Sequence, residues 1–390
     1  MLVCGASGCR AKSSGGEATA SSVPAASTTQ PALKTAFRED FLIGGALNPE
    51  QFNGRDTKGG EVITQHFNTI TPENVLKWEH VHPERGRYDF VPADAYVAYG
   101  ERHKMFIVGH TLVWHSQTPR WVFQDAAGAP VSRDTLLARM RDHIHTVAGR
   151  YKGRIHGWDV VNEALNEDGT LRQSPWLTII GPDYIAKAFE YAREADPNAQ
   201  LYYNDYSLEN PAKRAGAIRI IRELQARRIP IQGVGMQGHL KMDWPSVALE
   251  DSTITEFAAT GVKVHITELD IDVLPQPTRN RGADVSMRAQ AAAGLDPYKA
   301  ALPDSMQQAL AARYAAIFAV YLRHRDVIDR VTFWGVADGD SWLNGWPIPG
   351  RTSYPLLFDR AHQGKPALDS VLAKARGPRE TTPSRPRGEQ

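Results

Sequence analysis

Eight short apolar segments recur along the chain, and stretches with helical spacing lie between them. The segments cover residues 41–48, 67–74, 105–115, 155–164, 200–207, 231–240, 262–271 and 330–342. Their apolar residues run continuously instead of alternating with polar ones, which is typical of strands buried on both faces of a parallel sheet. Eight strand–helix units therefore predict an α/β fold, a single (β/α)8 TIM barrel. An open, doubly wound sheet is the alternative, because strand order and closure cannot be read from a sequence.

The stretches between the strands carry helix signals of their own. Ser132 can cap a helix in which Leu136 and Met140 fall on one face. A second helix, with Ile185 on its apolar side, is expected to end at the Asp-Pro-Asn turn that starts at Asp196. With 390 residues, of which 42% are hydrophobic, the chain has room for one barrel of ~250 residues with loops and tails.

Charge and cysteine content exclude several classes of protein. The chain has 45 Lys and Arg against 44 Asp and Glu, a formal net charge of +1, so no overall charge attracts nucleic acid. A neutral partner fits better. No run of ~20 apolar residues is present, which excludes a membrane-spanning helix. The two cysteines, Cys4 and Cys9, precede the predicted barrel, so no disulfide or cysteine–metal framework supports it.

The two ends of the chain are expected to lie outside a catalytic domain of residues 37–372. Residues 1–9 resemble the remnant of an export signal, and the Ala-Ser-Gly-Cys stretch that ends at Cys9 resembles a lipoprotein cleavage box. Residues 10–36 are rich in Ser, Ala, Gly, Thr and Pro, which predicts a disordered linker, and residues 373–390 predict a disordered tail. We therefore expect an exported bacterial protein that is secreted, periplasmic or anchored by a lipid on its cysteine.

Polar side chains gather where the predicted strands end. In a barrel these ends meet on the face that carries the βα loops, where active sites of this fold lie. One polar residue at such a place can simply mark the end of a strand, but this explanation becomes improbable when seven of eight strands share the feature. The residues are Asn48, Glu73, Asn74, His110, Trp114, His115, Asn162, Glu163, Asn204, Asp205, Gln237, His239, Glu268 and Asp270, and the stretch from Trp334 to Trp342.

Two glutamates among these residues suggest a reaction. Glu163 closes the fourth segment and Glu268 closes the seventh. Retaining hydrolysis of a glycosidic bond needs two carboxyl groups ~5 to 5.5 Å apart, one to protonate the leaving oxygen and one to attack the anomeric carbon. At that distance and an effective dielectric of ~20, repulsion of roughly 3 kcal/mol would keep one carboxyl protonated near neutral pH. The strand order does not reveal which glutamate is the acid.

Six segments resemble one enzyme family, in the family's own order. They are TPENVLKWE (71–79), GHTLVWHSQTP (109–119), GWDVVNEA (157–164), YYNDY (202–206), GMQGHL (235–240) and HITELDI (265–271). The sequence resembles the endo-β-1,4-xylanases of glycoside hydrolase family 10, and the likeness covers residues 37–372. It implies retaining hydrolysis of internal β-1,4-xylosidic bonds in xylan by double displacement. It also implies that Glu163 is the acid/base and Glu268 the nucleophile of a covalent glycosyl-enzyme.

The resemblance implies roles for the surrounding residues as well. Asn162 resembles the amide that binds the 2-hydroxyl of the −1 sugar, and Gln237 matches a position near the nucleophile. His239 and Asp270 resemble the pair that keeps the nucleophile ionised and aimed. The expected substrate-binding residues are Glu73, Asn74 and Lys77 in the −2 and −1 subsites, His110 and Trp114 at the −1 wall, Trp334 and Trp342 over the glycone sugars, and Asn204 and Tyr206 near the +1 sugar.

Trp334 and Trp342 suit a sugar because an indole can cover the apolar C–H face of a pyranose ring.

The resemblance implies less about three further positions, which are Trp346, His115 and Ser207. Trp346 lies in a loop that also resembles the family, and His115 is expected only to buttress the −1 wall. Ser207 stands where relatives often carry Asn, which is a departure on the +1 side.

Alternatives to this interpretation remain open in the sequence. His143 and His145 form an H-x-H pair, but residues two apart on a helix face different directions, and no thiolate or H-E-x-x-H motif accompanies them. We therefore expect a monomer that binds xylan and xylo-oligosaccharides without a metal or cofactor. Another retaining β-1,4-glycanase, acting on glucan, is the second possibility. The spacing of the motifs does not show whether the site has room for the hydroxymethyl group of glucose. A non-catalytic carbohydrate-binding barrel is the third possibility.

Overall fold

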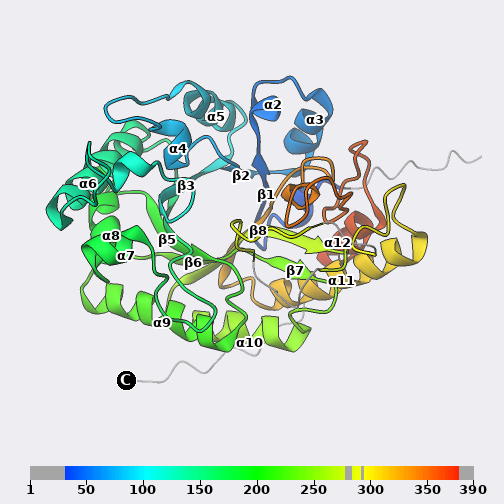
Figure 1. Ribbon diagram of the computed structural model, residues 1–390. Coiled ribbons are helices and arrows are strands. Elements are labelled where there is room, and N and C mark those ends of the chain that lie inside the picture. The colour runs from blue at the N-terminus through cyan, green and yellow to red at the C-terminus, as the bar shows by residue number, and fades with distance from the viewer. Residues whose placement is uncertain (1–30, 277–282, 291–293, 377–390) are drawn as a thin grey trace, which may run out of the picture. The chain divides into compact units, whose positions relative to one another are not determined.

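The computed structural model describes residues 31–276, 283–290 and 294–376, and those from Ala32 onward belong to one compact unit (Figure 1). The expected export segment, most of the expected linker and residues 377–390 of the expected tail lie outside these ranges. In the part of the chain that is described, no helix is both long and apolar enough to span a membrane.

Eight parallel strands form a closed barrel. They are β1 (Leu42–Leu47), β2 (Thr69–Pro72), β3 (Phe106–Trp114), β4 (Gly157–Asn162), β5 (Gln200–Asp205), β6 (Gly233–Met236), β8 (Lys263–Asp272) and β9 (Ile328–Phe333). Neighbours along the chain pair in order, β6 pairs with β8, and β9 pairs back with β1. The predicted (β/α)8 barrel is confirmed, and the open sheet is excluded because the first and last strands are hydrogen-bonded to each other.

Two predicted strands differ from the observed ones. The sixth segment is split into β6 and the short β7 (His239–Lys241), because Gly238 between them has φ of +79°, in the left-handed region. The eighth segment is a strand only as far as Phe333. Gly335, with φ of +133°, turns the chain away from the barrel, and the rest of the segment is a loop.

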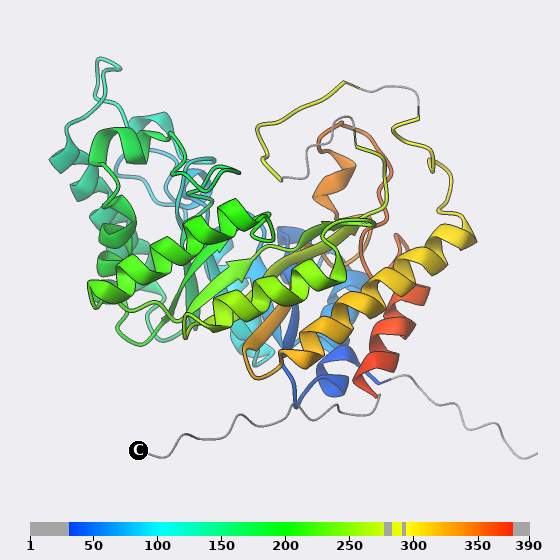
Figure 2. The ribbon, with the colours of Figure 1, turned by 90° about the horizontal axis from the view of Figure 1, so that it is seen from below.

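Helices pack around the outside of the strands (Figures 1 and 2). The longer ones are α3 (Thr57–His66), α5 (Val91–Arg102), α6 (Arg133–Arg150), α8 (Tyr184–Ala195), α9 (Pro211–Ala226), α10 (Val247–Ala258), α11 (Asp304–Arg323) and α12 (Pro366–Ala375). The short ones are α1 (Leu33–Ala36), α2 (Pro49–Phe52), α4 (Trp78–Val81), α7 (Pro175–Ile180) and the 3-10 turns η1 (Arg120–Val122) and η2 (Trp342–Asn344). Both helices expected from the sequence are present: the hydroxyl of Ser132 caps α6, and α8 ends one residue before Asp196.

The folded part of the chain begins earlier than the predicted residue 37. Leu33 in α1 is fully buried, and its N–H donates to Nδ1 of His66 at 3.3 Å. Phe37 stacks on Phe41 at 5.2 Å and packs against Phe318 of α11. Leu33 follows a Ser- and Ala-rich stretch, and nothing in the sequence indicated that it packs against a helix farther along the chain. At the other end, α12 continues to Ala375, three residues beyond the expected boundary.

Close packing between β3 and β4 leads to a first prediction. A Cβ added at Gly109 would lie 2.1 Å from Cε3 of the buried Trp158, so Gly109→Ala should lower the free energy of unfolding by about 1–3 kcal/mol or more. The midpoint of urea denaturation measures this change. Gly149→Ala is the matched control, because the added methyl group meets nothing within 4 Å on α6 and should change stability by about 1 kcal/mol or less. Equal effects of the two substitutions would contradict the packing argument.

Candidate active site

Glu163 lies directly after β4, at the C-terminal end of the barrel. The residue is buried, with 4% of its surface exposed. Nε1 of Trp114 donates to Oε2 at 2.9 Å, and Nε2 of Gln237 donates to Oε1 at 3.1 Å. These donors come from β3 and from the turn after β6, so two other strands hold the side chain of Glu163 in place.

Glu268 lies within β8 and is buried to a similar extent. Nδ2 of Asn204, in β5, donates to Oε1 at 2.8 Å, and Nε2 of His239, in β7, lies 3.2 Å from Oε2. Each oxygen of this carboxylate therefore has its own partner, one from β5 and one from β7.

Amide side chains connect the two glutamates. Oδ1 of Asn162 accepts hydrogen bonds from Asn204 at 2.9 Å and from Gln237 at 3.4 Å, and these two amides also contact Glu268 and Glu163, respectively. Nδ2 of Asn162 lies 3.3 Å from Oε1 of Glu163. The structure thus brings all five residues into one buried hydrogen-bond network, although they come from the end of β4, from β5, from β8 and from the turn after β6.

The two carboxyl groups are driven toward opposite protonation states. Burial raises the pKa of Glu163, and the charge of Glu268 adds to that effect, against hydrogen bonds from Gln237 and Trp114. Burial alone would also raise the pKa of Glu268, but the hydrogen bond from His239 and the charges of His110 and His239 outweigh it, so this pKa is lowered. The sequence argument made mutual repulsion the main cause, whereas burial is the larger cause at Glu163.

His239 stands between two carboxylates. Its Nδ1 lies 3.0 Å from Oδ2 of Asp270, and this oxygen also accepts a hydrogen bond from Nε1 of Trp342 at 2.8 Å. The ring of His239 is 4.9 Å from that of Trp342, in the loop after β9. A chain of contacts therefore runs from an indole through a carboxylate and an imidazole to Glu268.

A polar cluster lies beside the pair, after β2 and β3. Nζ of the buried Lys77 donates to Oδ1 of Asn74 at 3.0 Å and to Oε1 of Gln117 at 2.9 Å, and it lies 5.0 Å from the ring of Trp114. Burial lowers the pKa of Lys77, although nearby carboxylates oppose the change. Burial also raises the pKa of Glu73, and the charge of Lys77 opposes that rise. Gln117 was not singled out in the sequence, although it lies within the quoted segment 109–119.

Aromatic rings border the same face. The ring of Trp334 meets His110 edge-on at 5.4 Å, and Nδ1 of this buried histidine is 2.9 Å from Oδ2 of Asp159. Trp342 stacks on Trp346 at 4.5 Å with an interplanar angle of 24°. The loop after β9 therefore carries two stacked indoles, and one of them, Trp342, donates to Asp270.

Comparison with known proteins identifies the family of the chain. The sequence profile described as "Glycosyl hydrolase family 10" matches residues 32–374. The chain belongs to glycosyl hydrolase family 10. The match begins at residue 32, in agreement with the early start of the fold and not with the predicted boundary at residue 37.

Similar family 10 proteins are known in sequence and in structure. Endo-1,4-beta-xylanase A of Xylanibacter ruminicola is 45% identical over 350 residues, which are 90% of this chain and 95% of that protein. Endo-1,4-beta-xylanase of Geobacillus stearothermophilus is 42% identical over 349 residues, 88% of this chain and 98% of that protein. A solved GH10 endoxylanase retrieved from a sugarcane soil metagenome has 49% identity and a TM-score of 0.85, and the match covers 88% of this chain and 99% of that chain.

Family membership alone does not indicate whether this protein is exported from the cell. Both named organisms are bacteria, but one solved relative, from Thermoanaerobacterium saccharolyticum, is described as an intracellular xylanase, at 36% identity and a TM-score of 0.77. Export from the cell and a lipid on Cys9 therefore stay predictions.

Two residues expected to touch the +1 sugar have other partners in this family 10 barrel. Asn204 is fully buried and contacts Glu268, Asn162 and Thr267, so its amide lies among the catalytic candidates. The hydroxyl of Tyr206, also buried, accepts a hydrogen bond from Arg172 at 2.6 Å. Each of the two side chains is thus hydrogen-bonded to another protein group, and contact with the +1 sugar stays a prediction. Sequence position alone did not show these contacts.

The histidines considered as metal ligands are separated in the fold. His143 is buried in a stack with Trp78 at 3.6 Å, while His145, on the other side of α6, lies 3.0 Å from Glu194. His115 lies against Trp114 with ring centroids 5.8 Å apart, and burial lowers its pKa to about 4. The H-x-H pair therefore does not converge on one point.

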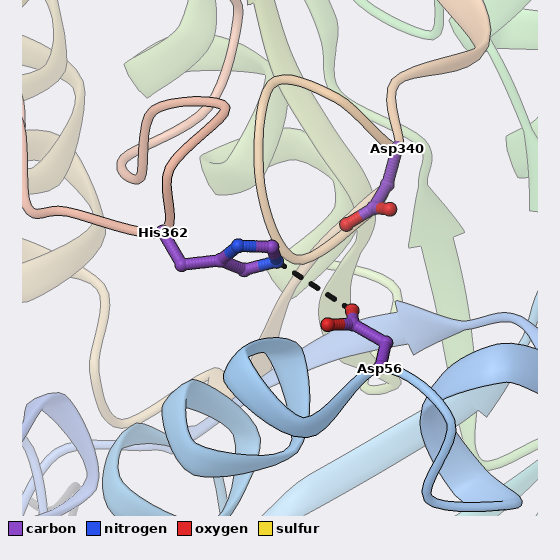
Figure 3. A group of neighbouring side chains, drawn as sticks. All are labelled: Asp56, Asp340 and His362. Carbon is purple, nitrogen blue, oxygen red and sulfur yellow. Dashed lines mark ion pairs between the residues drawn. The ribbon is translucent and has the colours of Figure 1, made fainter.

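Figure 3 shows another group with metal-ligand chemistry, which includes neither of the two glutamates. The candidate ligand atoms of Asp56, Asp340 and His362 lie within 4.8 Å of one another, and Nε2 of His362 is 3.5 Å from Oδ2 of Asp56. Asp56 caps α3 through the N–H of Gly59 at 2.9 Å, and Asp340 accepts from Nε2 of Gln51 at 3.0 Å. These contacts account for the arrangement without an ion, so we assign no metal to it.

The environment of His239 generates a prediction about stability and pH. Burial lowers the pKa of this histidine, but the neighbouring Asp270 and Glu268 raise it more strongly, to about 10. Since the ordinary value is 6.5, its protonation stabilises the fold fully below pH 6.5, and this contribution is lost as the pH rises through 10. The melting temperature of His239→Asn should therefore fall below that of the wild type by more at pH 6.5 than at pH 10.

Differential scanning fluorimetry across this pH range would measure the gap between the two melting temperatures. His145→Asn, which changes a partly exposed histidine on α6, is the control and should give a small gap throughout. A gap that widens with rising pH would show that His239 is neutral in the folded protein.

Proposed function

We propose that this family 10 protein cleaves internal β-1,4-xylosidic bonds of xylan with retention of configuration. The observation that carries the proposal is the buried amide network that joins Glu163 and Glu268, whose pKa values shift in opposite directions. A protonated and an ionised carboxyl group in one network are what double displacement requires at the start of the reaction. The xylanases among the similar proteins support xylan as the substrate.

In the first step, Glu268 attacks the anomeric carbon while Glu163 protonates the leaving oxygen. The bond from the sugar to that oxygen breaks, a bond from the sugar to Oε of Glu268 forms, and the shortened chain departs with the proton of Glu163. The hydrogen bonds from Asn204 and His239 keep Glu268 ionised before the attack. Burial raises the pKa of Glu163, which favours the protonated form that can donate to the leaving oxygen.

In the second step, Glu163 acts as a base. Once Glu268 is esterified its negative charge is gone, so the repulsion that favours the protonated form of Glu163 is removed. Glu163 can then take a proton from water as that water attacks the anomeric carbon and releases Glu268. No metal or cofactor takes part in either step.

The neighbouring side chains suit a sugar substrate. Glu73, Asn74 and Lys77 offer charged and amide groups for the hydroxyls of the −2 and −1 sugars, and Asn162 lies next to Glu163, where it can meet the 2-hydroxyl. Trp334 and Trp342 offer ring faces for the apolar side of the glycone. These assignments, a monomeric state and binding of xylo-oligosaccharides complete the proposal.

Turnover on xylan and on carboxymethylcellulose separates the two enzyme hypotheses. Xylose lacks the hydroxymethyl group of glucose, so a site shaped for xylan should favour xylan strongly. Faster release of reducing sugar from carboxymethylcellulose would favour a glucanase. A wild-type protein that binds xylan and releases no sugar would favour the non-catalytic carbohydrate-binding barrel.

The role of Glu163 can be tested through the leaving group. Glu163→Ala should slow the hydrolysis of xylan by about 10²- to 10⁴-fold, because that leaving group needs a proton donor. Cleavage of an activated dinitrophenyl glycoside, whose leaving group needs no proton, should have a nearly unchanged kcat/KM. Equal slowing of both substrates would refute the acid assignment.

The role of Glu268 and the stereochemistry have separate tests. Glu268→Ala should abolish hydrolysis of both kinds of substrate, because no covalent intermediate can form. Proton NMR of xylohexaose cleavage by the wild type should show the β-anomer as the first product and cleavage at internal bonds. An initial α-anomer would overturn double displacement, and full activity of Glu268→Ala would overturn the nucleophile assignment.

A further inference from the structure

The backbone of Glu163 is held in an unusual conformation. Its φ is +56°, in the left-handed region that a residue with a side chain as long as glutamate rarely adopts. Such a conformation is strained and persists only where the surroundings hold it. The carboxyl group reaches Trp114 and Gln237 from this backbone position, so whatever holds the backbone also aims the carboxyl group.

Two contacts hold the peptide groups on either side of this residue. The N–H of Glu163 donates to the carbonyl oxygen of Asn204 at 2.9 Å. The carbonyl oxygen of Glu163 accepts a hydrogen bond from Nε of Arg172 at 3.2 Å. The first contact is with the backbone of the adjacent strand, whereas the second depends on one side chain.

Arg172 is itself fixed from three directions. Besides Nε, its Nη2 donates to the hydroxyl of Tyr206 at 2.6 Å, and its Nη1 donates to Oδ2 of Asp284 at 2.9 Å. The loop after β4 returns on itself through a bridge between Leu165 and Leu171, and the N–H of Arg172 donates to the carbonyl oxygen of Ala164 at 2.7 Å. The guanidinium group, with a side chain 16% exposed, therefore lies beside the backbone of Glu163 and connects it to the end of β5.

We propose that Arg172 is a positioning residue for proton transfer: its guanidinium group holds the left-handed backbone of Glu163, so that the carboxyl group meets the leaving oxygen. This inference rests on the proposed function, in which Glu163 is the acid. It goes beyond that function because Arg172 touches neither carboxylate and acts through the carbonyl group of Glu163. The rigid fork of an arginine suits three acceptors at once, and a lysine cannot reproduce it.

The charge of Arg172 provides an independent readout. The charged and titratable groups around Glu163 are Glu268 in β8, Asp205 and Tyr206 at the end of β5, Lys77 after β2, and Arg172 itself. Lys77 and Arg172 are the positive groups among these, and the charge of Arg172 lowers the pKa of Glu163. Its removal should therefore raise that pKa and move the basic limb of the activity profile to higher pH.

The test uses Arg172→Gln and Arg172→Lys in the full chain, with kcat/KM measured on phenyl and dinitrophenyl β-xylobiosides. Because kcat/KM reports the first chemical step, Arg172→Gln should reduce it by about tenfold or more for the phenyl substrate, and by about threefold or less for the dinitrophenyl substrate. The basic limb for the phenyl substrate should shift upward in Arg172→Gln. It should stay in place in Arg172→Lys, which keeps the charge.

Arg219→Gln is the matched control. Arg219, in α9, donates from Nη2 to the carbonyl oxygen of Gly169 at 2.7 Å, so it holds the same loop without contacting Glu163. It should change both substrates by the same factor and leave the basic limb unchanged. Tyr206→Phe removes a hydrogen-bond acceptor of Arg172. It should reduce kcat/KM by less than Arg172→Gln does, and again by more for the phenyl than for the dinitrophenyl substrate. It replaces Arg172→Gln in the test if that variant does not fold.

The outcomes separate the positioning role from the proposed function. If Arg172→Gln slows both substrates equally and leaves the basic limb in place, Arg172 supports only the loop, and the inference is overturned. If Arg172→Lys and Tyr206→Phe also slow the phenyl and dinitrophenyl substrates by the same factor, the positioning role of Arg172 is overturned as well. If Glu163→Ala itself shows no dependence on the leaving group, the acid assignment fails, and the positioning role fails with it.

Discussion

The buried amide network between Glu163 and Glu268 is the constraint on which the rest of the site depends. Two carboxyl groups removed from water would both favour the protonated form, because burial disfavours charge. Asn204 and His239 give their hydrogen bonds to Glu268, whereas the neighbours of Glu163 do not offset its burial. The pKa values of these two chemically identical side chains therefore differ because their hydrogen-bond donors are placed differently.

The barrel supplies those donors because its strands are parallel and closed. All strand ends of one polarity then lie on one face, so side chains from β3, β4, β5, β7 and β8 can meet around the same point. The turn at Gly238 allows both Gln237 and His239 to reach the network from one short segment, each toward a different glutamate. Irregularities of the sheet thus occur where the chemistry needs a side chain to be redirected.

Much of this organisation could be predicted from the sequence. The eight strand segments, the helix capped by Ser132 and the convergence of polar residues at strand ends follow from local patterns. The docking of Leu33 on His66 and the part played by Gln117 did not, because each depends on a partner far away in the chain. The hydrogen bond of Asn204 to Glu268 could not be predicted either, because it depends on how two strands far apart in the sequence meet in the barrel.

By itself, the sequence determined the type and order of the elements, and which residue types stand at their ends, because these follow from apolar periodicity and turn chemistry along the chain. Only the tertiary structure shows why the pKa of Glu163 is raised and that of Glu268 is lowered. The two pKa values differ because of burial and because separate strands contribute the hydrogen-bond donors. The sequence of one strand does not specify how far it lies from another strand. The left-handed backbone of Glu163 and the guanidinium group beside it belong to this second class, since both exist only once the loop after β4 has closed on the barrel.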